Sequence, residues 1–153
     1  MPLVTTQIEI AAPPAVVRAK FLDFSKLPTY HESGFLKAVG PVKPGTPLEP
    51  GVKFDAKLGF DVVILENTPQ AFGWRGAVPG LFKGDHYFRF QPSKSSPGNT
   101  TFVHEENFTG ALSFLAGENF AAKWIGAPDN MRKNFTVFNE DLKKWCEDGS
   151  AKT

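Results

Sequence analysis

Two histidines and one glutamate are the residues of this chain best suited to proton-transfer chemistry. His86 belongs to the segment 83–91, and His104 and Glu106 belong to the segment 101–108. The other even-numbered positions of both segments hold Phe or Gly, whereas the odd-numbered positions are mostly polar, and this period of two is typical of half-buried strands. The three side chains are therefore expected to project from an aromatic face into the interior, where a polar group needs a partner, water or a ligand.

These residue types fit general acid–base catalysis, because an imidazole with a pKa of about 6.5 exchanges protons at neutral pH and a carboxylate can orient it. A dehydration or an aldol cyclisation needs little more. A structural alternative is that the imidazoles bond to Tyr30, to Thr hydroxyls or to the backbone, and that Glu106 pairs with Arg75. Two His and a carboxylate can also bind a divalent metal, but their spacing matches no metal-site signature, so we expect neither a metal nor a cofactor.

Length and composition limit the classes of protein that the chain can be. Its 153 residues suit a single domain spanning 1–153. Fifteen Phe and three Trp can fill a dense core or line a ligand cavity. Seventeen Lys and Arg balance sixteen Asp and Glu with no basic run longer than a pair, so no nucleic-acid partner is predicted.

The sequence also carries expectations about compartment and partners. Residues 1–12 alternate polar and apolar side chains, unlike a signal peptide, and no segment approaches the roughly 18 apolar residues of a membrane helix. We expect a cytoplasmic protein without stable membrane insertion, a monomer or a homodimer, whose partner is a small hydrophobic molecule. Cys146 is the only cysteine and is interpreted as an ordinary free thiol.

The first half of the chain predicts a strand, short helices and then further strands. Apolar residues alternate over 4–10, and Pro13 and Pro14 end this strand and begin a helix that continues to Phe24. A second short helix is predicted over 25–31. The Pro- and Gly-rich stretch 40–51 is predicted to be a loop, and 52–58 to be a strand.

The second half predicts two hairpins and a long helix. Segments 60–66 and 71–77 flank a turn-forming run, as do 83–91 and 101–108. A final helix begins near Pro128. Its apolar residues recur every three or four positions, which predicts an amphipathic helix lying on the open face of an antiparallel sheet in an α+β fold: Met131, Phe135, Phe138, Leu142 and Trp145.

This order of elements, together with four stretches of sequence, resembles the SRPBCC superfamily, also called START-like or polyketide cyclase/dehydratase-like. The stretches are Ile8–Pro14, Gly84–Phe90, Thr101–Gly110 and Asn139–Lys143. The resemblance covers nearly the whole chain and implies a helix-grip fold, in which a curved antiparallel sheet wraps a long C-terminal helix around a deep hydrophobic cavity, with two short helices after the first strand. The superfamily contains lipid-transfer domains, hormone-binding and allergen-like proteins, aromatic cyclases and oxygenase domains. The oxygenase branch fits poorly, because those members carry an iron–sulfur domain with paired Cys and His.

Several residues are candidates for the wall of such a cavity. In the fold that the resemblance implies, His31 lies near the cavity entrance, although a surface histidine is the commoner outcome. Trp74 either lines the pocket or packs in the core, and 78–84 forms either an apolar lid or an ordinary exposed loop. The expected ligand-binding residues are Tyr30, His31, Phe54, Trp74, Phe82, Phe88, Phe108, Met131 and Phe135.

Two functions of different classes follow from these observations. The first is binding of an aromatic or polyketide-like molecule in an internal cavity, with cofactor-free cyclase or dehydratase chemistry by His86, His104 and Glu106. The second is a non-catalytic carrier or sensor of a lipid-like ligand, in which the three polar groups orient a ligand hydroxyl or carbonyl. A protein-partner module with an exposed apolar surface is a third possibility if no cavity exists.

Overall fold

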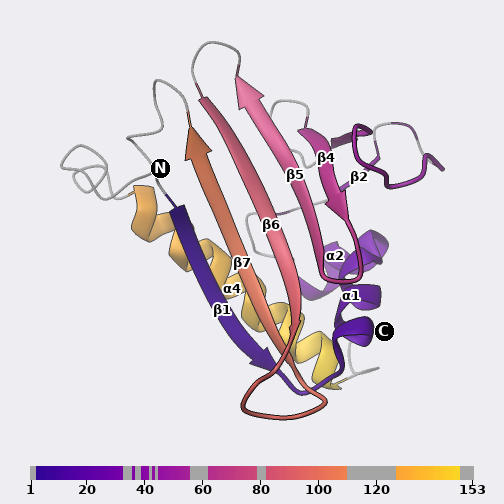
Figure 1. The fold of residues 1–153 in the computed structure, drawn as a ribbon, viewed down its shortest axis with the longest axis vertical. Coiled ribbons are helices and arrows are strands. Elements are labelled where there is room, and N and C mark those ends of the chain that lie inside the picture. The colour runs from indigo at the N-terminus through magenta and orange to yellow at the C-terminus, as the bar shows by residue number, and fades with distance from the viewer. Residues whose placement is uncertain are drawn as a thin grey trace.

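The computed structural model describes residues 3–32, 36, 39–41, 43, 45–55, 62–78, 82–109 and 127–148. Strands and helices follow one another in an order that agrees with the sequence-based prediction (Figure 1). The elements are β1 (Leu3–Ile10), α1 (Pro14–Leu22), η1 (Phe24–Lys26), α2 (Leu27–Tyr30), β2 (Gly40–Pro41), β3 (Lys53–Asp55), β4 (Val62–Asn67), β5 (Ala71–Val78), β6 (Phe82–Pro92), β7 (Thr100–Thr109) and α4 (Ala127–Asp148).

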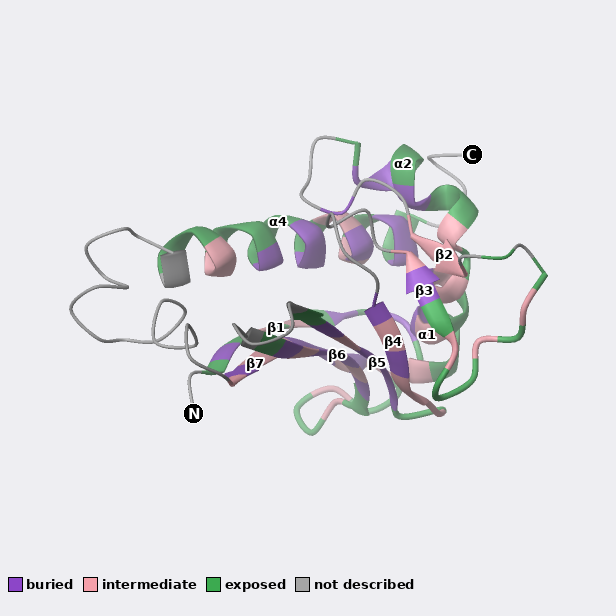
Figure 2. Ribbon diagram, turned by 90° about the horizontal axis from the view of Figure 1, so that it is seen from above, coloured by how far each residue is buried: buried purple, intermediate pink, exposed green. Residues whose placement is uncertain are grey.

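The strands form one antiparallel sheet in the order β1-β7-β6-β5-β4-β3-β2. Every hydrogen-bonded pair of neighbouring strands is antiparallel. Helix α4 runs along one face of this sheet, and α1 and α2 lie at the end nearest its C-terminus (Figure 2). The predicted α+β helix-grip fold is therefore confirmed.

Local sequence explains where the helices begin and which face they bury. Pro13 is extended, with φ of −63° and ψ of 151°, and Pro14 opens α1, a position where the missing N–H costs nothing. In α4 the predicted apolar stripe faces the sheet, with Phe138 and Leu142 fully buried and Phe135 nearly so. Burial of this stripe is what fixes the helix on the sheet.

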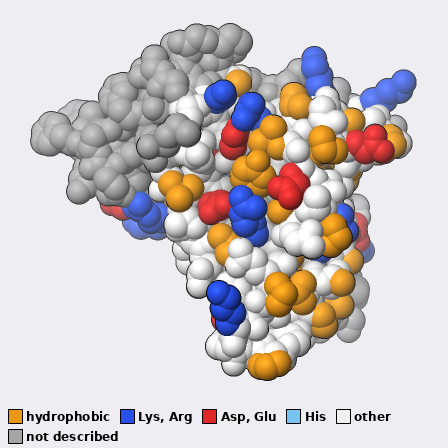
Figure 3. Space-filling model, viewed as in Figure 1, with side chains coloured by type: hydrophobic (Ala, Val, Ile, Leu, Met, Phe, Trp, Pro, Cys, Tyr) orange, Lys and Arg blue, Asp and Glu red, His pale blue; other side chains and the backbone are white. Residues whose placement is uncertain are grey.

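The two faces of the sheet differ as the alternation predicts. Apart from His86, His104, Glu106 and Thr6, side chains on the inner face, which α4 covers, are mostly aromatic or aliphatic, whereas the outer face carries charges of both signs among apolar groups (Figure 3). Arg75 on β5 donates two hydrogen bonds to Asp85 on β6, at 2.6 and 2.7 Å, and Arg89 donates one to Glu105 at 2.7 Å. The cations of the central strands are thus held by carboxylates away from the interior.

Two sequence-based expectations are wrong. His31 is fully buried rather than on the surface, because its ring packs edge-on against Phe138 at 5.0 Å and its Nδ1 lies 2.8 Å from Asp141 Oδ2. Arg75 does not pair with Glu106, because Arg75 projects from the outer face to Asp85.

Other differences are smaller. The stretch predicted as one loop contains β2, and a register shift between Ile64 and Glu66 was not expected. The predicted strand 52–58 is observed as 53–55, since 56–61 lie outside the described residues, as do positions 79–81 of the predicted lid. Within the described ranges, no helix is both long and apolar enough to cross a bilayer.

Candidate functional site

The register between β6 and β7 brings the three predicted catalytic residues together. His86 pairs with Glu106 across the ladder, and Phe88 pairs with His104, so the two histidines are diagonal neighbours on the inner face. Their Nε2 atoms are 2.6 Å apart. His86 Nδ1 lies 3.5 Å from Glu106 Oε2 on its other side.

Aromatic rings enclose both imidazoles. His104 stacks on Phe135 of α4 with ring centroids 3.9 Å apart, and His86 stacks on Phe88 at 4.7 Å. His104 is fully buried and His86 is 3% exposed, whereas the side chain of Glu106 is 18% exposed. Of the three residues, Glu106 is therefore the one with a side chain that a molecule from outside can reach most easily.

Burial acts in opposite directions on the two residue types. It lowers the pKa of His86 to about 3, and burial followed by the neighbouring His86 holds the pKa of His104 well below its ordinary value. Burial, followed by the charge of Asp85, raises the pKa of Glu106 to about 7. Both imidazoles are therefore neutral at physiological pH, and the carboxyl is the group that exchanges a proton there.

Two polar residues that the sequence analysis missed complete the cluster. Asn139 of α4 is 2% exposed, and its Oδ1 lies 3.0 Å from His104 Nδ1. Asn139 Nδ2 donates to the hydroxyl of Thr6 on β1 at 2.8 Å, and that hydroxyl donates to the main-chain oxygen of His104 at 3.2 Å. The available signal was spacing, because Asn139 follows Phe135 by four residues and so lies on the buried stripe of the helix.

A glycine makes room for the reactive carboxyl. A Cβ atom at Gly84 would lie 2.6 Å from Glu106 Oε1, so a larger residue there would displace that oxygen. Gly76, the neighbour of Gly84 on β5, is also buried. Two adjacent strands thus lack side chains on the inner face beside Glu106.

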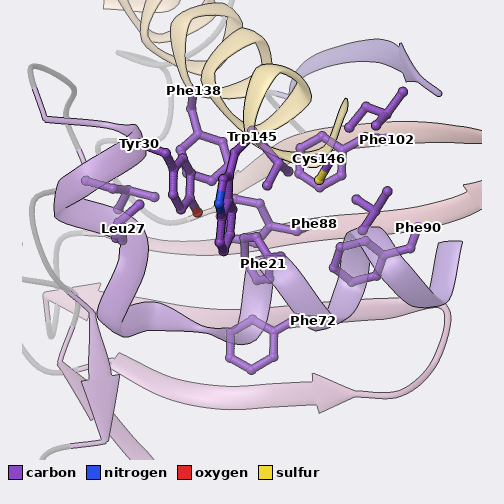
Figure 4. Close-up of a cluster of buried hydrophobic side chains, with 14 of the residues drawn as sticks. Phe21, Leu27, Tyr30, Phe72, Phe88, Phe90, Phe102, Phe138, Trp145 and Cys146 are labelled. Carbon is purple, nitrogen blue, oxygen red and sulfur yellow. The ribbon is translucent and has the colours of Figure 1, made fainter. Parts of the chain in front are cut away.

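A small apolar hollow lies next to this cluster, at the end of the fold formed by α1 and α2. Its cavity volume is only about 10 Å³, which is room for about one water molecule, whereas pockets that bury drug-sized ligands have volumes of about 300–1,000 Å³. Figure 4 shows the aromatic packing around it, in which Tyr30 stacks on Trp145 at 4.6 Å. The lining residues are Phe21, Phe24, Leu27, Tyr30, Leu36, Val39, Trp74 and Phe138.

The predicted ligand-binding residues fall into three groups. Tyr30 and Trp74 line the hollow, and Phe54 stacks on Trp74 at 5.4 Å. Phe88 contacts the two histidines. Phe108, Met131 and Phe135 form a second apolar cluster with Val4 near Glu106.

The remaining two predicted ligand residues lie elsewhere. His31 is held between Phe138 and Asp141 and is not among the residues lining the hollow. The side chain of Phe82 lies outside the described part of the chain. A role in ligand contact stays a prediction for all nine positions. Among the described residues, no group of three or more His, Cys, Asp or Glu side chains is arranged to hold a metal ion.

Comparison with known sequences decides the family. A model of the family described as polyketide cyclase/dehydrase and lipid transport matches residues 1–145. The chain belongs to this family. The resemblance inferred from the sequence is thereby confirmed. No curated protein matches the chain at a significant level.

Solved structures of several proteins share the fold at low sequence identity. A protein from Thermobifida fusca has a TM-score of 0.68 at 16% identity, with 98% of this chain and 96% of that chain covered. The Zhui aromatase/cyclase from a Streptomyces species has a TM-score of 0.59 at 11% identity, with 95% and 93% covered. DynU16, from the dynemicin biosynthetic locus, has a TM-score of 0.66 at 14% identity, with 97% of this chain covered. The chain spans 48% of the length of DynU16.

Proposed function

We propose that this member of the polyketide cyclase/dehydrase and lipid transport family binds a small aromatic or polyketide-like molecule against the inner face of the sheet. Glu106, supported by His86 and His104, then cyclises or dehydrates it by proton transfer. The observation that carries the proposal is the carboxyl of Glu106, which lies on an aromatic wall beside His86 with its pKa raised to about 7. A general acid or base works best when its pKa is close to the working pH.

The reaction needs no oxidant, reductant or metal to balance. In the carboxylate form, Glu106 removes a proton from a carbon next to a ketone, and the electron pair of that C–H bond forms an enolate. The enolate carbon bonds to a second carbonyl carbon, whose oxygen takes the proton and becomes a hydroxyl. In a dehydration, Glu106 protonates a β-hydroxyl that leaves as water with the C–O electron pair, and the carboxylate that remains takes the neighbouring C–H proton, whose electron pair forms the double bond.

Charge on the inner face favours an uncharged ligand. The basic side chains Arg75 and Arg89 of β5 and β6 are paired with carboxylates on the outer face. In the described strands, the inner positions around Glu106 hold apolar residues, glycines and neutral imidazoles. An anionic ligand would have to lose its hydration there without gaining a cation, which is unfavourable.

A second function is favoured by a different observation. Both imidazoles have pKa values far below neutrality, so neither changes its protonation state near pH 7. A carrier or sensor needs only fixed donors and acceptors to orient a ligand hydroxyl or carbonyl, and a neutral, buried cluster supplies them. In this case the protein retains its ligand unchanged.

The two functions are separated by exposing the purified protein to a metabolite extract of its source and following retained and transformed compounds by mass spectrometry. For an enzyme we expect a compound to be consumed and a product to appear. In Glu106→Gln its rate should fall by about 10²–10⁴-fold, the usual contribution of a general acid or base. Glu105→Gln, an acid on the outer face of the same strand, should keep the activity.

The possible outcomes are distinct. A compound retained without a product favours the carrier. Consumption at an unchanged rate in Glu106→Gln contradicts the role of Glu106. If nothing is retained or transformed, both functions are contradicted.

A further inference from the structure

We infer that the hydrogen bonds of the site are all donated in one direction, from Glu106 through the two histidines to Asn139 of α4, and that Thr6, Asn139 and His104 are positioning residues that fix the tautomer of His86. Glu106 is then the catalytic residue of the set, and it meets an uncharged carbonyl or hydroxyl oxygen of the ligand. The direction of the bonds stands on geometry and on the neutrality of the two buried imidazoles, whereas the role of Glu106 rests on the proposed function.

The donors and acceptors can be assigned one after another, starting from Thr6. Its hydroxyl donates to the main-chain oxygen of His104, and a carbonyl oxygen can only accept. The hydroxyl oxygen therefore accepts from Asn139, at 2.8 Å from Nδ2. This bond orients the amide, so that Oδ1, an acceptor, faces His104 Nδ1 at 3.0 Å.

The orientation of the Asn139 amide fixes which nitrogen of His104 donates and which accepts. Its Nδ1 carries the proton that Oδ1 of Asn139 accepts. A neutral imidazole has one N–H, so His104 Nε2 is an acceptor. His86 Nε2 must then be the donor in the contact of 2.6 Å between the two rings.

The consequence at His86 is that Nδ1 is the basic nitrogen turned towards Glu106. The distance of 3.5 Å to Oε2 is longer than a direct hydrogen bond of about 2.7–3.2 Å. Catalytic hydrogen bonds often shorten only when the ligand is bound. In this arrangement His86 accepts from the protonated carboxyl, and the buried chain behind it stays neutral while Glu106 gains or loses its proton.

Among the residues that the structure describes, the groups around Glu106 do not supply another proton acceptor or cation. From β6 it faces His86 and feels the charge of Asp85, and from β1 it pairs with Val4. On the α4 side, the apolar cluster next to Val4 contains Phe135 and Met131. The bound ligand is therefore the partner with which Glu106 exchanges a proton, and His86 only accepts a hydrogen bond from its acid form.

The opposite direction of the hydrogen bonds predicts a different placement of the protons on the two imidazoles. If the amide of Asn139 were turned over, Nδ2 would donate to His104 Nδ1, His104 Nε2 would donate to His86, and His86 Nδ1 would donate to Glu106. That arrangement would stabilise the carboxylate instead of the acid. The positions of the two imidazole protons therefore distinguish the alternatives.

The test is nitrogen NMR of protein labelled with ¹⁵N-histidine, which distinguishes protonated from unprotonated ring nitrogens. Between about pH 6 and pH 8, where both imidazoles are neutral, we expect the proton on Nδ1 of His104 and on Nε2 of His86. The opposite pattern, or a mixture of tautomers, would overturn the inference. No ligand is needed, so the result is independent of whether the proposed function is correct.

A variant tests the positioning role. Asn139→Asp places a carboxylate against His104 Nδ1, which should raise the pKa of that imidazole into the range that NMR can follow and should shift the titration of Glu106. Asn134→Asp, which adds the same charge at an exposed position of α4, should change neither. An unchanged His104 titration in Asn139→Asp would show that Asn139 does not set the state of the ring.

Discussion

Burial affects the acid–base behaviour of the two clustered histidines and of Glu106 in opposite ways. A histidine is an effective acid or base because its ordinary pKa is close to neutrality, but burial penalises the charged imidazolium and removes this property from His86 and His104. The same burial penalises the carboxylate of Glu106 and moves its pKa towards neutrality. The sequence therefore predicted that these three residues lie on one face, which the register confirms, but it could not indicate which of them has a pKa near neutrality.

The position of the Glu106 carboxyl depends on a missing side chain. We expect Gly84→Ala to destabilise the fold by about 1–3 kcal/mol, the usual cost of overpacking, because its Cβ would lie 2.6 Å from Glu106 Oε1. It should also change the pKa of Glu106, which carboxyl ¹³C NMR measures. The control is Gly40→Ala, where a Cβ meets nothing within 4 Å. An unchanged Glu106 titration in Gly84→Ala would mean that the carboxyl has room elsewhere.

At the scale of elements, α4 supplies polar partners to two buried histidines. It supplies Asn139 to His104 and Asp141 to His31, and Phe138 packs against both imidazoles. Its Lys143 donates to the main-chain oxygen of Glu9 at the end of β1, at 2.7 Å. Packing and polar contacts thus set the rotation of the helix together, and this rotation decides which side chains reach the histidines.

The contact between α2 and α4 can be tested through Asp141. We expect Asp141→Ala to lower the free energy of unfolding by about 1–3 kcal/mol, because the buried His31 Nδ1 loses this acceptor. Asp141→Asn keeps an acceptor oxygen and should recover much of that loss. Glu140→Ala removes the same charge from an exposed position one residue away and is the control. Equal urea midpoints for Asp141→Ala and Glu140→Ala would exclude a structural role of the His31 contact.

The elements were predictable where local pattern determines them. Alternation over β6 and β7 and the apolar stripe of α4 indicated their type, their buried faces and nearly their ends. The register of the hairpin was not predictable, because a slip of two residues keeps every Phe on the same face. The turn decides it: the Ser93 N–H donates to Asn99 O at 3.0 Å, and Gly98 adopts a φ of 87°.

Contacts between residues far apart in the chain account for what the sequence did not predict. His31 was expected on the surface because its acceptor, Asp141, is 110 residues away. Asn139 was missed because its partners lie on β1 and β7, and only the assembled fold places them around it. Polar networks of this kind leave only a weak trace in the sequence, namely one polar residue on an otherwise apolar stripe.

At the scale of the whole molecule, the buried groups link folding stability to pH in two opposing ways. His86 and His104 have lowered pKa values in the folded protein, so the unfolded chain binds more protons and stability is lost as the pH falls below about 6.5. Glu106 has a raised pKa, so its contribution is fully present below the unfolded value of 4.5 and is lost as the pH rises through about 7. Between about pH 4.5 and pH 6.5, a fall in pH weakens the folded state through the histidines and strengthens it through Glu106, so the two effects partly cancel.

Glu106→Gln removes one of the two effects, because a neutral amide replaces the protonated acid. Between about pH 8 and pH 5, we expect the two imidazoles to cost the variant about 4 kcal/mol, whereas retention of the Glu106 proton should reduce the cost in the natural protein to about 2 kcal/mol. Urea unfolding at both pH values measures this difference, and the other titrating groups cancel between the two proteins. Equal losses would mean that Glu106 ionises at an ordinary pKa, and its assignment as the proton-exchanging group would then be wrong.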